Sequence, residues 1–307
     1  MASFFRYPGG KSKLRAQIVD CLSTQAYESG LEYREPFFGG GSIGLKLLAD
    51  HSCFPWVWVN DKDVGIACLW TAVMRYPDVF KKHVTEFVPS VEAFYALKQE
   101  LSLLKAMPTA SADIALVGFK KLALHQISYS GLGAMSGGPL GGKDQKSSYK
   151  VDCRWSPQYI CKKVDAIHRL FAGLQVRQQW CTNLDFADVI TNDSCKALIY
   201  LDPPYYDKGN ELYQHGFSVE DHRRLAILLR NTDHAWVLSY DDCPEIRELY
   251  EWASFHTVNV KYSITGLKDE EGSRKSTMKP ELLIYPQAEE VVYGIEDKHL
   301  TFSHVPV

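Results

Sequence analysis

Short apolar segments that alternate with helical patterns constrain the fold of this 307-residue chain more than any other feature. Because a strand, a helix and a second strand form the repeating unit of α/β proteins, we expect an α/β fold with a mainly parallel sheet. The strands are predicted at residues 32–38, 56–60, 174–179, 197–201, 235–240, 254–260 and 281–285.

The middle of the chain interrupts this alternation. Helical patterns are predicted there at residues 63–75, 91–105, 112–126 and 157–171, with no clear strand among them. A glycine-rich loop, "SYSGLGAMSGGPLGGKDQKSSY", lies between the last two patterns, and a loop of this length is usually functional or disordered. The sequence therefore predicts a core that is divided by a helical insertion.

Charge is distributed unevenly between this insertion and the rest of the chain. The whole chain has a net charge of −3, which taken alone argues against a nucleic-acid binder. From Lys120 to Cys181, however, ten lysines and arginines outnumber three acids, so this segment carries +7 and the remainder −10. A basic segment inside an acidic protein is typical of a binding surface for a polyanion, although a solvated charged face would have the same composition.

The segment "REPFFGGGSIGLKLL" has the pattern of a strand, a glycine turn and a helix. Gly39, Gly41 and Gly44 match GxGxxG, a turn that lets a nucleotide-like ligand approach bare backbone beside helix N–H groups. The alternative is a tight turn without a ligand. Asp61 ends the next strand, where a carboxylate can accept hydrogen bonds from ribose hydroxyls or cap the following helix.

A lysine near the N-terminus stands on a glycine hinge, in "RYPGGKSKL". A phosphate-binding Walker motif would need glycine where Phe5 stands, so the GKS triplet does not indicate an NTPase. Lys11 is instead suited to pair with a ligand carboxylate, and an ordinary surface lysine is the alternative.

The segment "ALIYLDPPYYDKGNELY" places a carboxylate, a rigid bend and aromatic rings at the end of a predicted strand. Asp202 and the rigidly held carbonyl of Pro203 are two acceptors for one NH2 group, and Tyr205 offers a ring for the heterocycle that carries it. This pattern predicts a pocket for the exocyclic amine of a nucleobase, with a plain turn as the alternative. The ring of Tyr205, and not its hydroxyl, is expected to matter.

Taken in order, these motifs resemble the Dam-like DNA adenine N6-methyltransferases. The resemblance rests on "RYPGGK", "EPFFGGGS", the "ND" at Asn60–Asp61, "NLDF" at 183–186, "DPPYY" and "RKSTMKPELLIY", which follow the α-type motif order. It implies a Rossmann-like, S-adenosylmethionine-dependent methyltransferase sheet with a mostly helical DNA-recognition insertion. It also implies methyl transfer to the exocyclic amine of adenine in double-stranded DNA, after the base is flipped into the DPPY pocket.

The resemblance also assigns residues to the expected sites. The S-adenosylmethionine site would comprise Tyr7, Lys11, Gly39, Gly41, Asp61, Asp185, Phe186 and Asp202. Asp202, Pro203 and Tyr205 would hold the target adenine and act in catalysis. The DNA contacts are expected in the insertion, at Ser130, Lys143, Lys146, Lys150 and Arg154. No metal site is expected.

The expected organisation follows from the position of the insertion. Residues 1–66 and 165–287 would form the catalytic domain, 67–164 the DNA-recognition insertion and 288–307 a C-terminal extension. No stretch approaches the roughly 18 apolar residues of a membrane span, and no apolar signal-peptide core is present at the start. We therefore expect a cytoplasmic protein that is not bound to a membrane. We also expect it to be monomeric in solution.

Three other functions are consistent with parts of the sequence. A cytosine N4-methyltransferase would use the same chemistry, but more often has Ser at the position of Asp202. An NAD-dependent Rossmann oxidoreductase would explain the glycine turn and Asp61, but neither DPPYY nor the basic segment. A DNA-binding module without catalysis would not need Asp202. The recognition sequence, and a phage, restriction–modification or housekeeping role, stay open.

Overall fold

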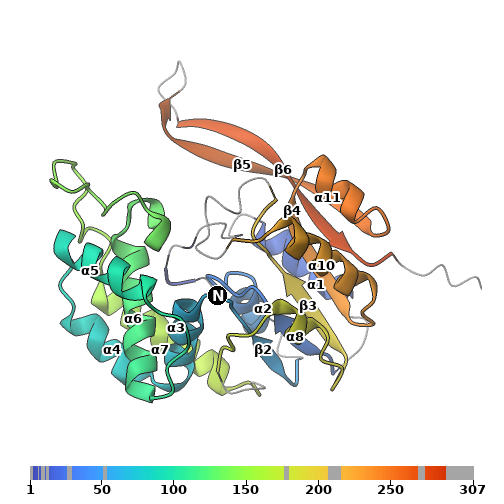
Figure 1. Ribbon diagram of the computed structural model, residues 1–307, viewed down its shortest axis with the longest axis horizontal. Coiled ribbons are helices and arrows are strands. Elements are labelled where there is room, and N and C mark those ends of the chain that lie inside the picture. The colour runs from blue at the N-terminus through green and yellow to red at the C-terminus, as the bar shows by residue number, and fades with distance from the viewer. Residues whose placement is uncertain are drawn as a thin grey trace, which may run out of the picture.

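The computed structural model describes residues 3–5, 7, 11, 14–25, 30–50, 54–175, 180–206, 216–268 and 274–287, with side chains described outside 260–279. Its centre is a six-stranded sheet in the order β2-β1-β3-β4-β6-β5 (Figure 1). The strands are β1(Glu32–Glu35), β2(Val57–Val59), β3(Ala197–Leu201), β4(Ala235–Asp241), β5(Ser254–Lys268) and β6(Arg274–Tyr285). The strands β2, β1, β3 and β4 are parallel, whereas β6 is antiparallel to both β4 and β5. The predicted α/β fold is confirmed.

Helices cover both faces of the sheet around β3. Ala197, Ile199 and Leu201 pack with α8(Phe186–Ile190), α10(Val219–Arg230) and α11(Pro244–Leu249). Leu198 and Tyr200 point to the opposite face, into the cluster that includes α1(Arg15–Gln25). Because successive side chains of a strand point to opposite faces, a strand covered on both sides has a continuous apolar sequence. This explains why "ALIYL" was predicted with its observed bounds.

The predicted helical middle lies beside the sheet, on the left of Figure 1, and shares one apolar core with it. It comprises α3(Val64–Arg75), α4(Pro77–Glu86), α5(Val91–Ser102), α6(Ser111–Ile127) and α7(Pro157–Ala172). Gly118 of α6 lies against α3, where a Cβ atom would come within 2.6 Å of Leu69 Cα, so this close crossing requires glycine. The expected boundaries at 67 and 164 fall inside α3 and α7, and the division of the chain into domains stays a prediction.

Several predicted strands differ from the structure, and the one predicted at 32–38 ends at Glu35. Only residues 174 and 175 of the strand predicted at 174–179 are described, and they are not in a strand. The predicted strands at 254–260 and 281–285 are the bases of a much longer hairpin, which pairs as far as Lys268 and Arg274 and projects beyond the sheet in Figure 1. Val258, Val260, Tyr262 and Ile264 alternate with polar residues, so the period-2 pattern of a strand continues beyond the predicted end at residue 260. The extension at 288–307 lies outside the described residues.

Within the part of the chain that the structure describes, the helices are all too short or too polar to cross a bilayer.

Candidate active site

The glycine turn between β1 and α2(Gly44–Asp50) forms one wall of a pocket at the carboxyl ends of the parallel strands. Gly39 and Gly41 have φ angles of 47° and 64°, in the region that favours glycine. Tyr7 lies directly over the turn, because a Cβ atom at Gly39 would come within 2.7 Å of its Cε1 atom. Trp70 of α3 donates a hydrogen bond to the Gly39 carbonyl at 2.8 Å and so fixes the turn from the other side.

Asp61 joins the glycine turn to the start of α3. Its Oδ2 atom accepts a hydrogen bond from Gly39 N at 2.7 Å, and Oδ1 accepts one from Asp63 N at 2.8 Å. The cap of α3 is Asp63, which accepts from Ile66 N at 3.0 Å, so the alternative prediction of Asp61 as this cap is wrong. Burial, together with the nearby Asp63 carboxylate, raises the pKa of Asp61 to about 7.

Asp202 follows the last residue of β3 and faces the glycine turn across the pocket. Its Oδ1 atom lies 2.5 Å from Lys11 Nζ and accepts a hydrogen bond from Ser239 Oγ at 3.1 Å. Its Oδ2 atom makes no hydrogen bond with any residue that the structure describes. Burial raises the pKa of Asp202 above its usual value, and the Lys11 ammonium opposes that rise. Lys11 thus contacts Asp202, a partner that the sequence did not predict.

Glu35 is a further acid of this pocket that was not predicted as a site residue. It is 2% exposed, and its Oε2 atom accepts a hydrogen bond from Tyr33 OH at 2.7 Å. Burial raises the pKa of Glu35 well above its usual range, despite that hydrogen bond. A Cβ atom at Gly44 would lie 2.4 Å from Glu35 Oε2, so glycine is needed there for the acid to fit. Its position in "REPFFGGG", just before the turn, was the available signal.

Lys11 is not among the described residues that line this pocket, and Asp185 and Phe186 lie at the start of α8. Asp185 caps α8 and accepts two hydrogen bonds from Arg224 Nη2, both at 2.9 Å. The guanidinium of Arg224 also lies 4.4 Å from the centre of the Phe186 ring. Neither predicted residue lines the described pocket, although Phe37, which does, packs against Phe186 with ring centres 5.6 Å apart.

Tyr205 lies beside Asp202. Its ring contacts Lys11, and its hydroxyl contacts Glu281. Lys11 Nζ lies 4.5 Å from the centre of the ring, and the hydroxyl donates a hydrogen bond to Glu281 Oε2 at 2.7 Å. The hydroxyl therefore makes a contact that sequence reasoning missed. Pro203 is buried, and its carbonyl accepts no hydrogen bond from the described residues.

The predicted DNA-contacting residues all lie in the loop between α6 and α7. Ser130 is exposed and has a φ angle of 56°, which is unusual for a residue other than glycine. Lys143, Lys146, Lys150 and Arg154 are exposed as well. The structure thus leaves these side chains accessible to a polyanion, and their contact with DNA stays a prediction.

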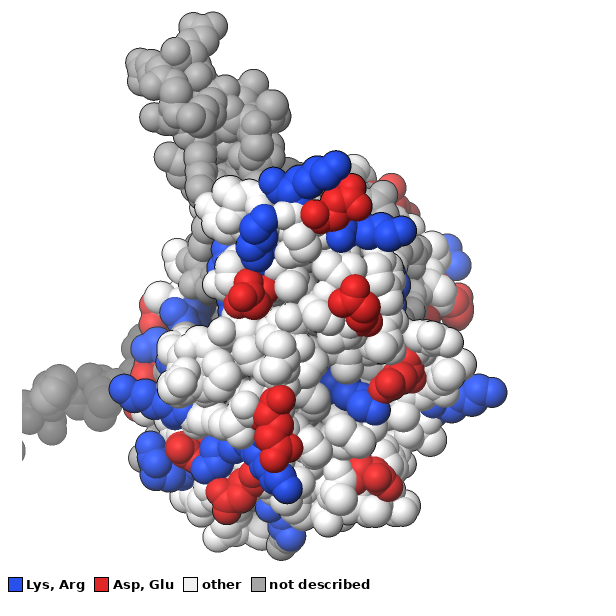
Figure 2. All heavy atoms as spheres, turned by 90° about the vertical axis from the view of Figure 1, so that its left-hand side faces the viewer, with Lys and Arg blue, Asp and Glu red and all other residues white. Residues whose placement is uncertain are grey.

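Acids from other parts of the chain neutralise some of the basic segment. Lys121 is buried against Asp63 at 2.5 Å, and Lys120 pairs with Glu100 at 2.6 Å. Figure 2, which faces the left-hand side of Figure 1, shows lysine and arginine interspersed with acids. The excess of +7 counted along the sequence is therefore not presented as one continuous basic patch on this face.

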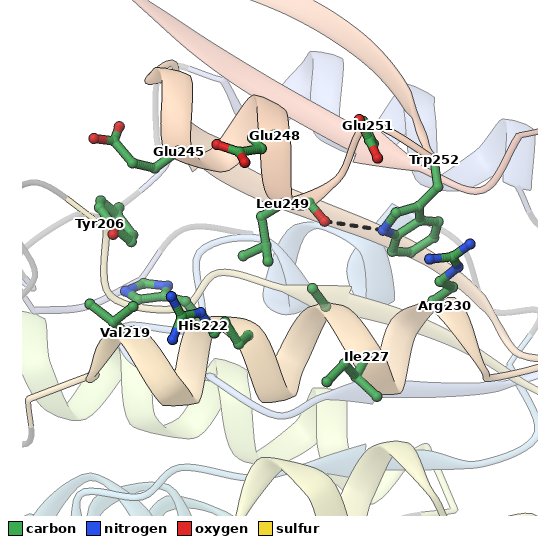
Figure 3. A pocket seen from close by; sticks show the side chains of 12 residues that line it. Tyr206, Val219, His222, Ile227, Arg230, Glu245, Glu248, Leu249, Glu251 and Trp252 are labelled. Atoms are coloured by element: carbon green, nitrogen blue, oxygen red, sulfur yellow. Dashed lines mark hydrogen bonds between the residues drawn. The ribbon is translucent and has the colours of Figure 1, made fainter.

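A wider groove lies between α10 and α11 (Figure 3). Ile227 and Arg230 of α10 and Glu248 and Trp252 on the other side line it. It contains none of the predicted catalytic, cofactor-binding or DNA-binding residues, so the candidate active site is the smaller pocket at the glycine turn.

One comparison with known proteins covers most of the chain. The model of the family described as D12 class N6 adenine-specific DNA methyltransferase matches residues 7–264. The matched region contains the glycine turn, Asp61, the loop between α6 and α7, and Asp202. A search of the curated proteins finds no match.

Proposed function

The chain belongs to the D12 class N6 adenine-specific DNA methyltransferases, and from this we propose that Asp202 and Pro203 hold the amine of an adenine turned out of duplex DNA. The enzyme transfers a methyl group from S-adenosylmethionine to adenine N6 in DNA. The proposal is supported by a difference between the two carboxylate oxygens of Asp202 in their hydrogen bonds. Lys11 and Ser239 hold Oδ1, whereas Oδ2 makes no hydrogen bond with the described residues. Oδ2 and the Pro203 carbonyl are then two acceptors for one amine.

The residues of the glycine turn fit the methyl donor. Gly39 and Gly41 bring backbone without side chains to the pocket, and Asp61 supplies a carboxylate beside them, as a ribose requires. We propose that Tyr7, Lys11 and Asp61 line this cofactor site. Phe186 would act on it through Phe37, with Asp185 and Arg224 holding Phe186 in place. When bound, S-adenosylmethionine supplies an activated methyl group, so the protein mainly positions the reactants.

Asp202 would act on the charge that develops during transfer. The lone pair of an adenine amine is delocalised into the ring, and hydrogen bonds to two acceptors favour the tetrahedral nitrogen that attacks. The nitrogen becomes positive as it attacks, and the carboxylate of Asp202 stabilises this charge. Turning the base out of the duplex costs a few kcal/mol. Stacking on Tyr205, worth roughly 1–3 kcal/mol, offsets part of that cost.

Binding of S-adenosylmethionine should depend on pH through Asp61. Ionised Asp61 is the better acceptor for ribose hydroxyls, and its pKa is raised to about 7 by burial. Affinity should therefore increase as pH rises through 7, since deprotonation produces the form that binds. Asp61→Asn should lose this dependence and bind about tenfold more weakly at pH 8. Calorimetric titration between pH 6 and 9 measures both effects.

Asp193→Asn is the control, since the Asp193 side chain is 90% exposed. Its curve should follow the wild type. Parallel pH curves for wild type and Asp61→Asn would show that another group controls cofactor binding.

We also propose that the substrate is double-stranded DNA and that the loop between α6 and α7 contacts its phosphates. Neutralising Lys143, Lys146 and Lys150 together should lower the slope of log K against log salt concentration by up to about 0.9 for each lost phosphate contact. The support is that all three are exposed on one loop. Fluorescence anisotropy over a series of salt concentrations measures the slope.

Lys82, Lys196 and Arg223, which are exposed outside this loop, provide a matched control when all three are neutralised. An unchanged slope in the triple variant would mean that its lysines form only a solvated face.

We further propose that the enzyme is a monomer in solution and acts in the cytoplasm, where DNA and S-adenosylmethionine meet. Light scattering of the purified chain tests the first statement. For the reaction itself, expression in a methylation-free host, followed by sequencing that maps modified adenines, tests the function and reveals the recognition sequence. DNA without N6-methyladenine would contradict it.

A further inference from the structure

Two neighbouring strands hold the aromatic segment that follows Asp202. Tyr205 OH donates a hydrogen bond to Glu281 Oε2 at 2.7 Å, and Tyr206 N donates one to Asp241 Oδ1 at 3.2 Å. Asp241 on β4 and Glu281 on β6 are directly opposite each other in the antiparallel pair. One pair of cross-strand carboxylates thus fixes both the ring of the first tyrosine and the backbone of the second.

The side chain of Glu281 is buried, where a carboxylate is energetically unfavourable unless it is hydrogen-bonded. It is 2% exposed, and burying a carboxylate without hydrogen bonds is strongly unfavourable. The strand pairing of β6 uses backbone groups only, so the sheet itself does not require an acid at this position. The hydrogen bond from Tyr205 links this buried acid to the site.

The ring of Tyr205 is held from two directions. Glu281 fixes the hydroxyl end, and Lys11 Nζ lies 4.5 Å from the ring centre while it contacts Asp202. Because Lys11 contacts both groups, rotation of the Tyr205 ring is coupled to the position of Asp202. Neither Tyr205 nor Glu281 lines the pocket at the glycine turn, so Lys11 is the member of this arrangement that is shared with the residues proposed to bind the cofactor.

We propose that Glu281 is a positioning residue for the target adenine: it holds the Tyr205 ring in the orientation on which the base stacks, while Asp241 fixes the backbone that carries the ring. This inference rests on the proposed roles of Asp202 and Tyr205. A base that stacks on a misplaced ring would present its amine away from Asp202, because reacting atoms need closely defined positions. Glu281 acts on the base through Tyr205 and does not itself touch the reacting atoms. Its charge also raises the pKa of Asp202, so turnover of all variants is compared at a pH where Asp202 is ionised in each of them.

A double-mutant cycle tests this. Glu281→Ala and Tyr205→Phe should each lower kcat about tenfold, because each removes one partner of a charge-assisted hydrogen bond. The double variant should be no slower than the slower single variant, because both changes remove the same contact. The affinity for S-adenosylmethionine should change less than about twofold in every variant. Glu281→Gln retains an oxygen that accepts from the hydroxyl, so it should lose severalfold less than Glu281→Ala.

Glu248→Ala, on α11 in the groove of Figure 3, is the matched control and should have wild-type turnover. Multiplied losses in the double variant, or an unaffected Tyr205→Phe, would overturn the proposal. If Glu281→Ala does not fold, Tyr205→Phe and Glu281→Gln decide the matter by the same comparison. Asp202→Ala distinguishes a wrong assignment of the active site from a wrong role for Glu281. Full turnover in that variant refutes the proposed active site, whereas its loss together with normal Glu281 variants refutes only the role of Glu281.

Discussion

Asp202→Ala is expected to lower kcat for methyl transfer by about 10³-fold or more, while the affinity for DNA changes less than about threefold. The loss follows from removing the carboxylate that stabilises positive charge on the attacking nitrogen, an interaction that is strongest in the transition state. DNA affinity is preserved because it comes mainly from phosphate contacts, and Asp202 would touch one amine. Single-turnover kinetics and anisotropy with the same duplex measure the two quantities.

Asp202→Asn refines this test, because it keeps the size of the side chain and an acceptor oxygen but removes the charge. A loss almost as large as in Asp202→Ala would identify the charge as the important property. Turnover of Asp202→Ala within about tenfold of wild type would exclude the assigned role.

Lys11→Met is expected to lower turnover at pH 7 by about 100-fold and to move the acid limb of the pH–rate profile to higher pH. Lys11 is buried against Asp202 at 2.5 Å and opposes the rise in pKa of Asp202 that burial causes. Without the ammonium, the pKa of Asp202 rises further. Activity that needs the carboxylate is lost as pH falls through this pKa, so the loss begins at a higher pH. Methionine keeps the volume of the stem and removes only the charge.

Other groups also act on Asp202, and they define the controls. Glu281 raises the pKa of Asp202, and the hydrogen bond from Ser239 lowers it. Lys11→Arg retains a positive charge and should keep its acid limb closer to wild type than Lys11→Met does. An acid limb that stays in place in Lys11→Met would show that the lysine does not control ionisation of Asp202.

The sequence predicted elements at the site with uneven accuracy: the strand before the glycine turn, predicted at 32–38, ends at Glu35, whereas the strand before Asp202 matches. The strand at 197–201 has the same bounds in prediction and structure, because burial on both faces produces an unbroken apolar run. The glycine turn was predicted because its conformation requires glycine at 39 and 41. Local patterns therefore located Asp202 and the turn, and the alternation of elements implied that both lie at one edge of the sheet.

The contacts that complete the site could not be predicted, since their partners are far apart in the sequence. Lys11 and Asp202 are 191 residues apart, and Tyr205 and Glu281 are 76 apart. Such pairs depend on which strands become neighbours, and β6 inserts between β4 and β5. The same limitation affected the charge count, because the acids that neutralise Lys120 and Lys121 come from outside the basic segment.

The central claim is that the target adenine leaves the duplex and that its amine binds Asp202. A fluorescent adenine analogue at the mapped methylation site tests this claim most directly. An analogue that leaves the base stack becomes brighter, and stacking on Tyr205 quenches part of that increase. We predict that emission rises when wild-type enzyme saturates the duplex and rises further with Tyr205→Ala. Emission that stays at the level of the unbound duplex, at enzyme concentrations where binding is complete, would contradict the claim.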